Sequence, residues 1–243
     1  MDIRIIQSFH KKDQISFLDD AFIPQDNTDN ISPELREYRF FLRHYREGMH
    51  KEADYTGILS WKFNHKTKIT GKVFIDFIKN NPGYDVYFVN PFLQEVYHFK
   101  NVWLHGESCH PGIIEFVQKI LIRLNYNINL KEIKNTHETA LYCNFWVGNA
   151  YFWDQYMKFT MPIYDYLLND LTDEEKMFIN QPADRCRDAT ATYFSFIVER
   201  LFSTLLVYNK NIKSLAYKYP CVELQMLRTL QDRLNEVRKS QQL

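Results

Sequence analysis

The sequence predicts an α/β fold in which helices cover a mostly parallel sheet and the C-terminal part is helical. Strand-like and helix-like segments alternate over the first 90 residues in the order β, α, β, α, β, which favours parallel strands. Apolar residues make up 45% of the 243 residues and aromatic residues 16%, a composition that argues against disorder. The chain is therefore long enough and apolar enough to bury a substantial core.

The first strand is predicted over residues 3–9, where Ile3, Ile5 and Ile6 are β-branched and no breaker intervenes. Residues 22–30 form a predicted polar loop. A helix follows, with Ser32 as its N-cap, Pro33 in its first turn, and an end near Gly48. Its apolar face consists of Leu35, Tyr38, Phe41, Leu42 and Tyr45.

A second strand is predicted over residues 55–63, and a loop over residues 66–71. Thr70 is positioned to cap a helix that runs to about residue 80, before a turn at residues 81–83.

The third strand, over residues 85–90, indicates where a site would lie. Val86, Phe88 and Val89 favour a strand, and Pro91 cannot continue a central ladder, so the strand ends at Asn90. In open α/β sheets ligands bind outside the carboxyl ends of the strands, and Asn90 is therefore a candidate ligand contact.

The rest of the chain divides into predicted elements by the same criteria. A helix-like stretch and a polar loop precede a helix that begins at Pro111. The later elements are a connector over 125–138, a strand over 140–147, a helix over 151–168 that Pro162 kinks or splits, a helix over 171–180 capped by Thr172, a loop over 181–188 with Arg185 and Arg187, a buried helix over 189–208, a short segment over 213–220 that suits an edge strand, and a helix over 222–241.

Residues 1–208 are predicted to form the α/β domain, and residues 209–243 an edge segment with an amphipathic helix. The apolar stripe of this helix has a spacing near the heptad period and consists of Leu224, Leu227, Leu230, Leu234 and Val237. The stripe either folds back on its own domain or pairs with a second chain in a homodimer.

The net charge and the spacing of the cysteines argue against broad nucleic-acid binding, a zinc site and a disulfide framework. Thirty basic and thirty acidic residues give a formal net charge of zero, which offers no electrostatic surface for broad nucleic-acid binding. The four cysteines form no C-x-x-C pair, so we expect reduced thiols in a cytoplasmic protein rather than a zinc site or a disulfide framework. The N-terminus does not resemble a signal peptide, and no apolar run approaches the ~18 residues of a membrane span, although peripheral membrane contact stays open.

Two histidines and a carboxylate lie close together in the predicted loop over residues 105–112. His105, Glu107 and His110 suit proton transfer or hydrogen bonding to a hydroxylated ligand. Metal binding is an alternative, although the spacing is not a standard zinc pattern. A solvated loop that caps a helix is the other interpretation.

Glu199 and Arg200 lie within the predicted buried helix, where a charge is costly unless it is paired or functional. Adjacent helical positions point about 100° apart, so each side chain needs another partner or faces a cleft. Asn144 ends a strand-like run, and it is either a ligand contact or a satisfied strand-end residue. Glycine-rich phosphate motifs and D-x-D are both absent from the sequence.

Three groups of segments resemble bacterial glycosyltransferase-like proteins encoded in surface-polysaccharide clusters. Together they extend over most of the chain, from about residue 3 to residue 208. They are residues 30–38 with 54–63, residues 85–91 with 101–103 and 106–112, and residues 143–148 with 152–153 and 199–202.

The resemblance implies a GT-A-like fold that transfers sugar from a nucleotide-sugar donor to a glycan acceptor in capsule or lipopolysaccharide synthesis. Under this hypothesis Glu107 is the catalytic base, His110 a diphosphate or acceptor ligand, and Arg200 the counter-charge to the leaving phosphate. The donor and acceptor would be bound by Ser60, Lys62, Asn90, His105, Asn144 and Glu199.

The missing D-x-D motif predicts a transferase without a divalent metal cofactor, with Arg200, His110 and Lys62 compensating the diphosphate charge. The expected location is the cytoplasm or the inner face of the membrane. The alternative is a non-catalytic carbohydrate-binding or scaffold protein of a polysaccharide synthase complex.

Overall fold

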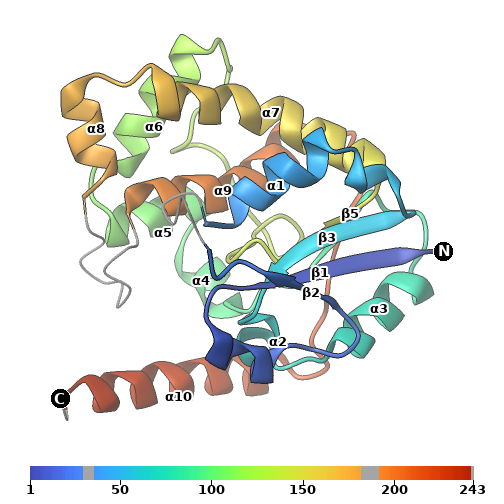
Figure 1. The fold of residues 1–243 in the computed structure, drawn as a ribbon. Helices are drawn as coiled ribbons and strands as arrows, with labels where there is room; N and C mark the ends of the chain where they lie inside the picture. The colour runs from blue at the N-terminus through green and yellow to red at the C-terminus, as the bar shows by residue number, and fades with distance from the viewer. Residues whose placement is uncertain (30–35, 182–191, 242–243) are drawn as a thin grey trace.

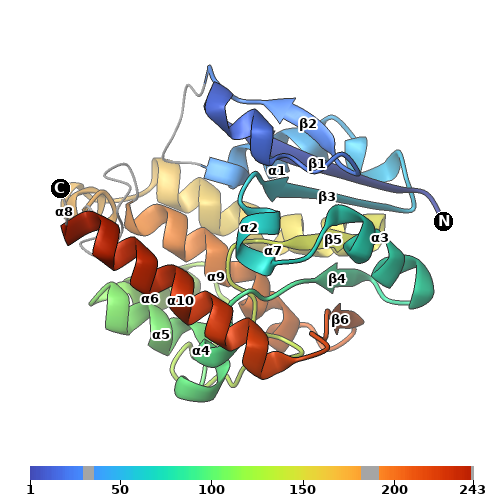
Figure 2. The ribbon, with the colours of Figure 1, turned by 90° about the horizontal axis from the view of Figure 1, so that it is seen from below.

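A six-stranded sheet lies at the centre of the protein, in the spatial order β2-β1-β3-β5-β4-β6 (Figure 2). The computed structural model describes residues 1–29, 36–181 and 192–241. The strands are β1 (Ile3–Phe9), β2 (Ile23–Asp26), β3 (Tyr55–Ser60), β4 (Val86–Phe88), β5 (Trp146–Gly148) and β6 (Ser214–Ala216).

The sheet is mixed. β1 pairs in parallel with β2 and β3, and β4 pairs in parallel with β6. β5 lies between β3 and β4 and is antiparallel to both, so it alone of the six runs in the opposite direction. The prediction of an α/β fold is confirmed, with one reversed strand inside the sheet.

Helices cover both faces of this sheet (Figure 1). In chain order they are η1 (Lys12–Phe17), α1 (Arg36–Arg46), η3 (Met49–Lys51), α2 (Phe63–Thr67), α3 (Gly71–Asn80), α4 (Leu93–His98), α5 (Val102–Cys109), α6 (Ile113–Arg123), α7 (Ala150–Asn169), α8 (Asp173–Ile179), α9 (Tyr193–Tyr208) and α10 (Val222–Gln241).

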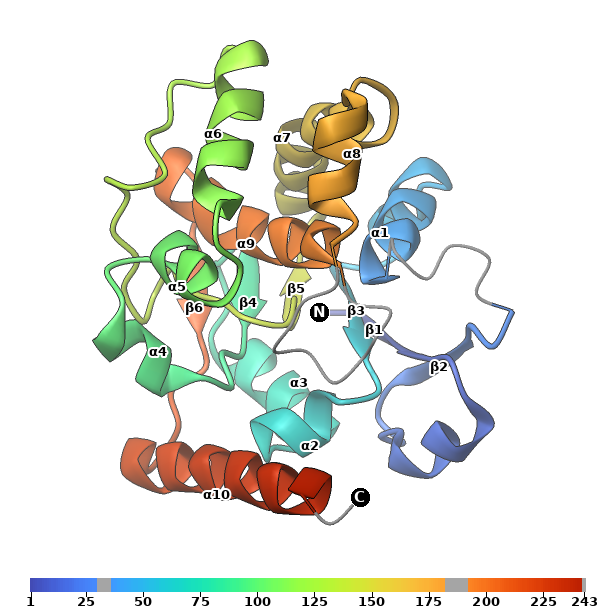
Figure 3. The same cartoon turned by 90° about the vertical axis from the view of Figure 1, so that its left-hand side faces the viewer.

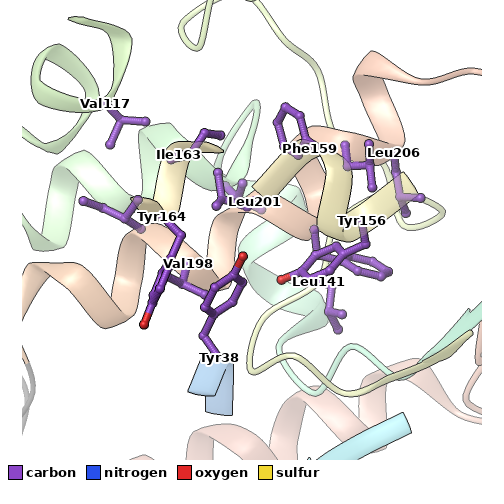
Figure 4. Packing of buried hydrophobic residues seen from close by; sticks show 14 of the residues in the cluster. Tyr38, Val117, Leu141, Tyr156, Phe159, Ile163, Tyr164, Val198, Leu201 and Leu206 are labelled. Atoms are coloured by element: carbon purple, nitrogen blue, oxygen red, sulfur yellow. The ribbon is translucent and has the colours of Figure 1, made fainter. Parts of the chain in front are cut away.

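Two apolar cores result, one on each face, because neighbouring strand residues point to opposite sides. In the larger core, helices α1, α5, α6, α7 and α9 pack on Ile58, Phe88 and Trp146. In the smaller core, α2, α3 and the start of α10 pack on Leu59 and Tyr87. Figure 4 shows part of the larger core, where Tyr38 of α1 meets Tyr164 of α7 and Val198 of α9.

Several predicted elements are confirmed. The first strand, the Thr70 cap of α3, the capping box at Thr172 of α8 and an edge strand within 213–220 all occur. The second strand occurs as far as Ser60 and not to residue 63, because Phe63 begins α2. α9 is buried on most of its circumference, as its composition predicted. The expected N-cap Ser32, with Pro33 and Leu35, and the arginines Arg185 and Arg187 lie outside the described residues.

Other predictions were wrong. His105 and Glu107 lie in helix α5 and not in a loop, because the side chain of Asn101 accepts the N–H groups of Trp103 and Leu104 and starts a helix there. The predicted loop over 66–71 begins inside α2. The polar segment over 22–30 contains strand β2. Of the two outcomes predicted at Pro162, splitting is wrong, because α7 is one helix from Ala150 to Asn169.

The C-terminal helix α10 lies on the domain with a polar side inward. Gln225 donates to the carbonyl of Lys66, and Thr229 donates to the carbonyl of Pro91. By contrast, Leu224, Leu227 and Leu230 are exposed by 44%, 62% and 54%. The described leucines of the apolar stripe therefore face away from the domain, and pairing with a second chain stays a prediction.

None of the described helices is both long enough and apolar enough to cross a membrane.

Candidate functional site

The carboxyl ends of β1, β2, β3, β4 and β6 meet at one edge of the sheet, which we call the carboxyl edge (Figure 3). β1 connects to β2 on one side, whereas β3 connects to β4 on the other side. The ends of β1 and β3 therefore form a topological switch point, where open α/β sheets bind ligands.

An aromatic patch formed by His10, Phe17 and Trp61 lies at this switch point. The ring centroid of Trp61 is 5.6 Å from that of Phe17 and 6.4 Å from that of His10. Phe17 is 54% exposed, and His10 is also exposed. Exposed rings beside each other offer a stacking surface to a flat ligand.

Local hydrogen bonds hold the aromatic patch in place. The side-chain oxygen of Gln14 accepts the N–H groups of His10 and Lys11, which folds the chain back into η1 and brings Phe17 to Trp61. The N–H of Trp61 donates to the carbonyl of Ser8 at 2.9 Å, so Trp61 lies beside the end of β1.

Ser60 and two lysines continue the carboxyl edge from the aromatic patch. Ser60 is the last residue of β3 and is partly exposed. Nζ of the exposed Lys62 lies 5.1 Å from the ring centroid of Trp61. Nζ of Lys66 donates to Sγ of Cys143 at 2.9 Å, which brings a second positive charge to the start of β5.

Asn90 and Asn144 lie at the far part of the carboxyl edge. The N–H of Val89 donates to the carbonyl of Phe145 at 2.9 Å, so Asn90 and Asn144 each lie one residue beyond this bonded pair, and Asn144 lies in the turn before β5. Asn90 is 2% exposed and Asn144 is 6% exposed. Within the described part of the chain, Nδ2 of Asn90 and Oδ1 of Asn144 have no hydrogen-bond partner.

Arg200 of α9 lies in the body of the protein, 2% exposed. Its Nε donates to the carbonyl of Val102 at 2.9 Å, and its Nη1 donates to the carbonyl of Phe196 at 2.7 Å. A Cβ atom at residue 106 would lie 2.5 Å from Nε, so Gly106 leaves the space that the guanidinium occupies. Burial lowers the pKa of Arg200, and the carboxylate of Glu199 opposes this shift.

His105 joins Arg200 to a buried carboxylate. Nη2 of Arg200 lies 3.4 Å from Nδ1 of His105 and can only donate, so Nδ1 accepts and the proton of neutral His105 is on Nε2. This Nε2 atom lies 3.8 Å from a carboxylate oxygen of Glu95 and 3.9 Å from Sγ of Cys109. We call Arg200, His105 and Glu107, together with Glu95 of the preceding helix α4, the α5–α9 cluster.

Glu107 and His110 have roles in the fold. The two carboxylate oxygens of Glu107 accept the N–H groups of Gly112 and Ile114, at 2.7 and 3.0 Å, at the N-terminus of α6. His110 is buried, with its ring centroid 4.1 Å from that of Phe196. The sequence analysis had left helix capping open, and the structure places Glu107 in that position.

The residues singled out from the sequence lie on two groups of elements, which are in contact through Tyr142, whose ring centroid lies 5.0 Å from that of His105 and 6.2 Å from that of Phe92. Ser60, Lys62, Asn90 and Asn144 lie along the carboxyl edge, whereas Glu107, His105, His110, Glu199 and Arg200 lie on α5, its C-terminal end and α9. The sequence analysis missed His10, Phe17, Trp61 and Lys66. Trp61 had a signal, since it stands between Ser60 and Lys62 at a predicted strand end.

Asp85 lies at the amino end of β4, away from the carboxyl edge. Its carboxylate accepts the side-chain amide of Asn149 and the N–H of Lys213. Among residues 1–29, 36–181 and 192–241, no group of three His, Cys, Asp or Glu side chains is arranged to hold a metal ion.

Comparison of the chain with protein-family models, with curated proteins and with solved structures finds no match.

Proposed function

We propose that the protein is a GT-A-like glycosyltransferase that moves a sugar from a nucleotide-sugar donor, bound at the carboxyl edge, to a glycan acceptor. The observation that carries this proposal is the exposed aromatic patch at the switch point between β1 and β3, with Lys62 beside it. Ligands of open α/β sheets bind at such a point, and aromatic side chains there suit a nucleobase.

The donor would lie along the carboxyl edge. Its base would stack on Trp61 and Phe17, and its diphosphate would meet Lys62 and Lys66. Neighbouring strands are about 4.8 Å apart, so the β4–β5 boundary lies about 10 Å from the switch point. A nucleotide sugar is long enough to extend from one to the other.

The proposed transfer does not use a divalent metal. Arg200 donates to two backbone carbonyls and the ring of His110 stacks on that of Phe196, and Lys66 therefore replaces them beside Lys62 in compensating the diphosphate charge. Capsule or lipopolysaccharide synthesis at the inner face of the cytoplasmic membrane is the process that the sequence resemblance implies for such an enzyme.

A second candidate is a non-catalytic carbohydrate-binding or scaffold protein of a polysaccharide synthase complex. The contacts of Glu107 favour it, because both carboxylate oxygens of the expected catalytic base accept backbone N–H groups. An aromatic patch also suits the apolar faces of sugar rings.

Isothermal titration calorimetry against a panel of nucleotide sugars and the matching nucleotides tests the proposal. A glycosyltransferase is expected to bind at least one donor and to release its nucleotide slowly by hydrolysis. Binding of glycan fragments without affinity for any nucleotide would favour the second candidate. A protein that binds neither class would overturn both.

A further inference from the structure

Two side-chain amides at the carboxyl edge each bury one polar atom that has no hydrogen-bond partner among the described residues. Nδ2 of Asn90 is a donor and Oδ1 of Asn144 is an acceptor, and neither makes a hydrogen bond within the described residues. Both side chains are more than nine-tenths buried. A buried polar atom that loses its water without gaining a partner is costly, and these two atoms lie one residue beyond the bonded pair of Val89 and Phe145, so a water molecule or a ligand group is expected to satisfy them.

The other contacts of Asn90 leave its donor atom available. Its Oδ1 already accepts the N–H of Phe92 at 3.0 Å, which fixes the orientation of the side-chain amide. Nδ2 is the atom that remains. Asn90 therefore offers a donor, not an acceptor, to a ligand.

Asn144 is held in an unusual backbone conformation. Cys143 and Asn144 have φ angles of 76° and 52°, in the left-handed region that few residues other than glycine adopt. The bond from Nζ of Lys66 to Sγ of Cys143 places a positive charge next to Asn144. The unpaired acceptor therefore lies beside a cation that would meet the donor's diphosphate.

We infer that Asn90 and Asn144 together bind a hydroxyl group of the sugar carried by the nucleotide donor. A hydroxyl both accepts and donates a hydrogen bond, so it complements one amide N–H and one amide oxygen. This inference rests on the proposed function, and it assigns sugar selection to the β4–β5 end of the carboxyl edge. Lys66 then lies between the site of the diphosphate and the site of the sugar.

Substitutions at Asn90 and Asn144 can remove the proposed hydrogen bond to the ligand and preserve the backbone conformation. Asn144→Gly removes the acceptor, and glycine adopts the left-handed conformation without strain. Asn90→Asp keeps an oxygen for the N–H of Phe92 and replaces the donor by an acceptor. Asn125→Gly is the matched control, because Asn125 is exposed, has a φ of 59° and lies just past the end of α6.

The experiment is calorimetric titration of each protein with a uridine or guanosine diphosphate sugar and with the diphosphate alone. The wild-type protein is expected to bind the nucleotide sugar more tightly than the nucleotide. Asn144→Gly should weaken nucleotide-sugar binding about tenfold and leave nucleotide binding unchanged. Asn90→Asp should also weaken nucleotide-sugar binding by at least about tenfold. Asn125→Gly should change neither affinity.

Equal wild-type affinity for nucleotide and nucleotide sugar, or wild-type affinity in both variants, would overturn the inference and assign the two amides to a water molecule. A wild-type protein that binds no nucleotide at all contradicts the proposed function instead. In that case, saturation-transfer NMR with free glucose, galactose and N-acetylglucosamine tests the hydroxyl site independently of nucleotide binding. Transfer that disappears in Asn144→Gly supports a hydroxyl site, and absence of transfer to the wild type excludes one.

Discussion

The α5–α9 cluster and the carboxyl edge both contain polar side chains, but they differ in how many of these polar atoms have a hydrogen-bond partner within the protein. In the α5–α9 cluster, Arg200 donates to two backbone carbonyls and Glu107 accepts two backbone N–H groups. At the carboxyl edge, the amides of Asn90 and Asn144 each have an unpaired atom, and Phe17 is exposed. We therefore expect the first region to stabilise the fold, and the ligand site that we propose lies in the second.

The largest expected effect on stability comes from breaking the α5–α9 cluster. Arg200→Ala leaves a cavity and removes two charge-assisted hydrogen bonds, so the free energy of unfolding should fall by about 3–5 kcal/mol in urea denaturation. Arg200→Met fills similar space without a buried charge and should cost much less. If Arg200→Ala keeps wild-type stability but loses transferase activity, Arg200 is a catalytic counter-charge after all.

Acid should destabilise the packing of helix α1 on strand β3, where two histidines are buried. His44 donates to or accepts from Oγ1 of Thr56, and burial lowers the pKa of His44 from 6.5 to about 4. Burial also lowers the pKa of His50, while Asp154 opposes that shift. Both histidines are therefore neutral in the fold and take up protons more readily in the unfolded chain.

The stability from His44 is complete above pH 6.5 and is lost as pH falls toward 4, by about 3 kcal/mol in total. Urea denaturation at a series of pH values measures this loss. His44→Gln serves as the control and should flatten the dependence between pH 6.5 and pH 4. A wild-type curve as flat as that of the variant would show that His44 does not titrate as described.

Glu107 should have a smaller effect, as a helix cap. Glu107→Ala leaves the N–H groups of Gly112 and Ile114 without acceptors and should lower the free energy of unfolding by about 1–2 kcal/mol. Glu107→Gln keeps one acceptor oxygen and should cost less. Transfer by Glu107→Gln at the wild-type rate would exclude Glu107 as the base, whereas a hundredfold loss at unchanged stability would restore it.

The smallest effect on stability is expected at the exposed face of α10. Replacing Leu227 and Leu230 together by Ser should change the free energy of unfolding by less than about 0.5 kcal/mol, because both are exposed. If this face pairs with a second chain, light scattering will detect a wild-type dimer and a monomeric variant. A wild-type monomer, or a variant that stays dimeric, would exclude that pairing.

The sequence predicted the fold class well because its signals are local. The β-branched run at residues 3–9 and the caps at Thr70 and Thr172 act within a few residues. The direction of β5 is a tertiary property, since Trp146–Gly148 is a short strand whose partners come from distant β3 and β4. No local pattern distinguishes a parallel from an antiparallel strand of that length.

The site was predictable only in part. Strand-end reasoning pointed to Asn90, Ser60 and Lys62, because Pro91 and the apolar runs mark the strand ends. The predicted strand over 140–147 was wrong in its extent, because β5 begins only at Trp146 and Asn144 lies in the turn before it. The composition of residues 105–110 indicated chemistry, but the contacts that occupy those side chains come from distant elements, such as the bonds between α9 and Val102. The aromatic patch depends on η1 folding back onto β3, which no spacing in the sequence reveals.

One titration compares the two regions directly. Wild type, Trp61→Ala and Arg200→Met are each titrated with the nucleotide sugar that the wild type binds best, and thermal unfolding confirms that each protein is folded. Our account predicts that Trp61→Ala weakens binding by about 10- to 100-fold, the contribution of one base stacked on an aromatic ring, and that Arg200→Met keeps wild-type affinity. Wild-type affinity in Trp61→Ala, with binding lost in Arg200→Met, would contradict a ligand site at the carboxyl edge.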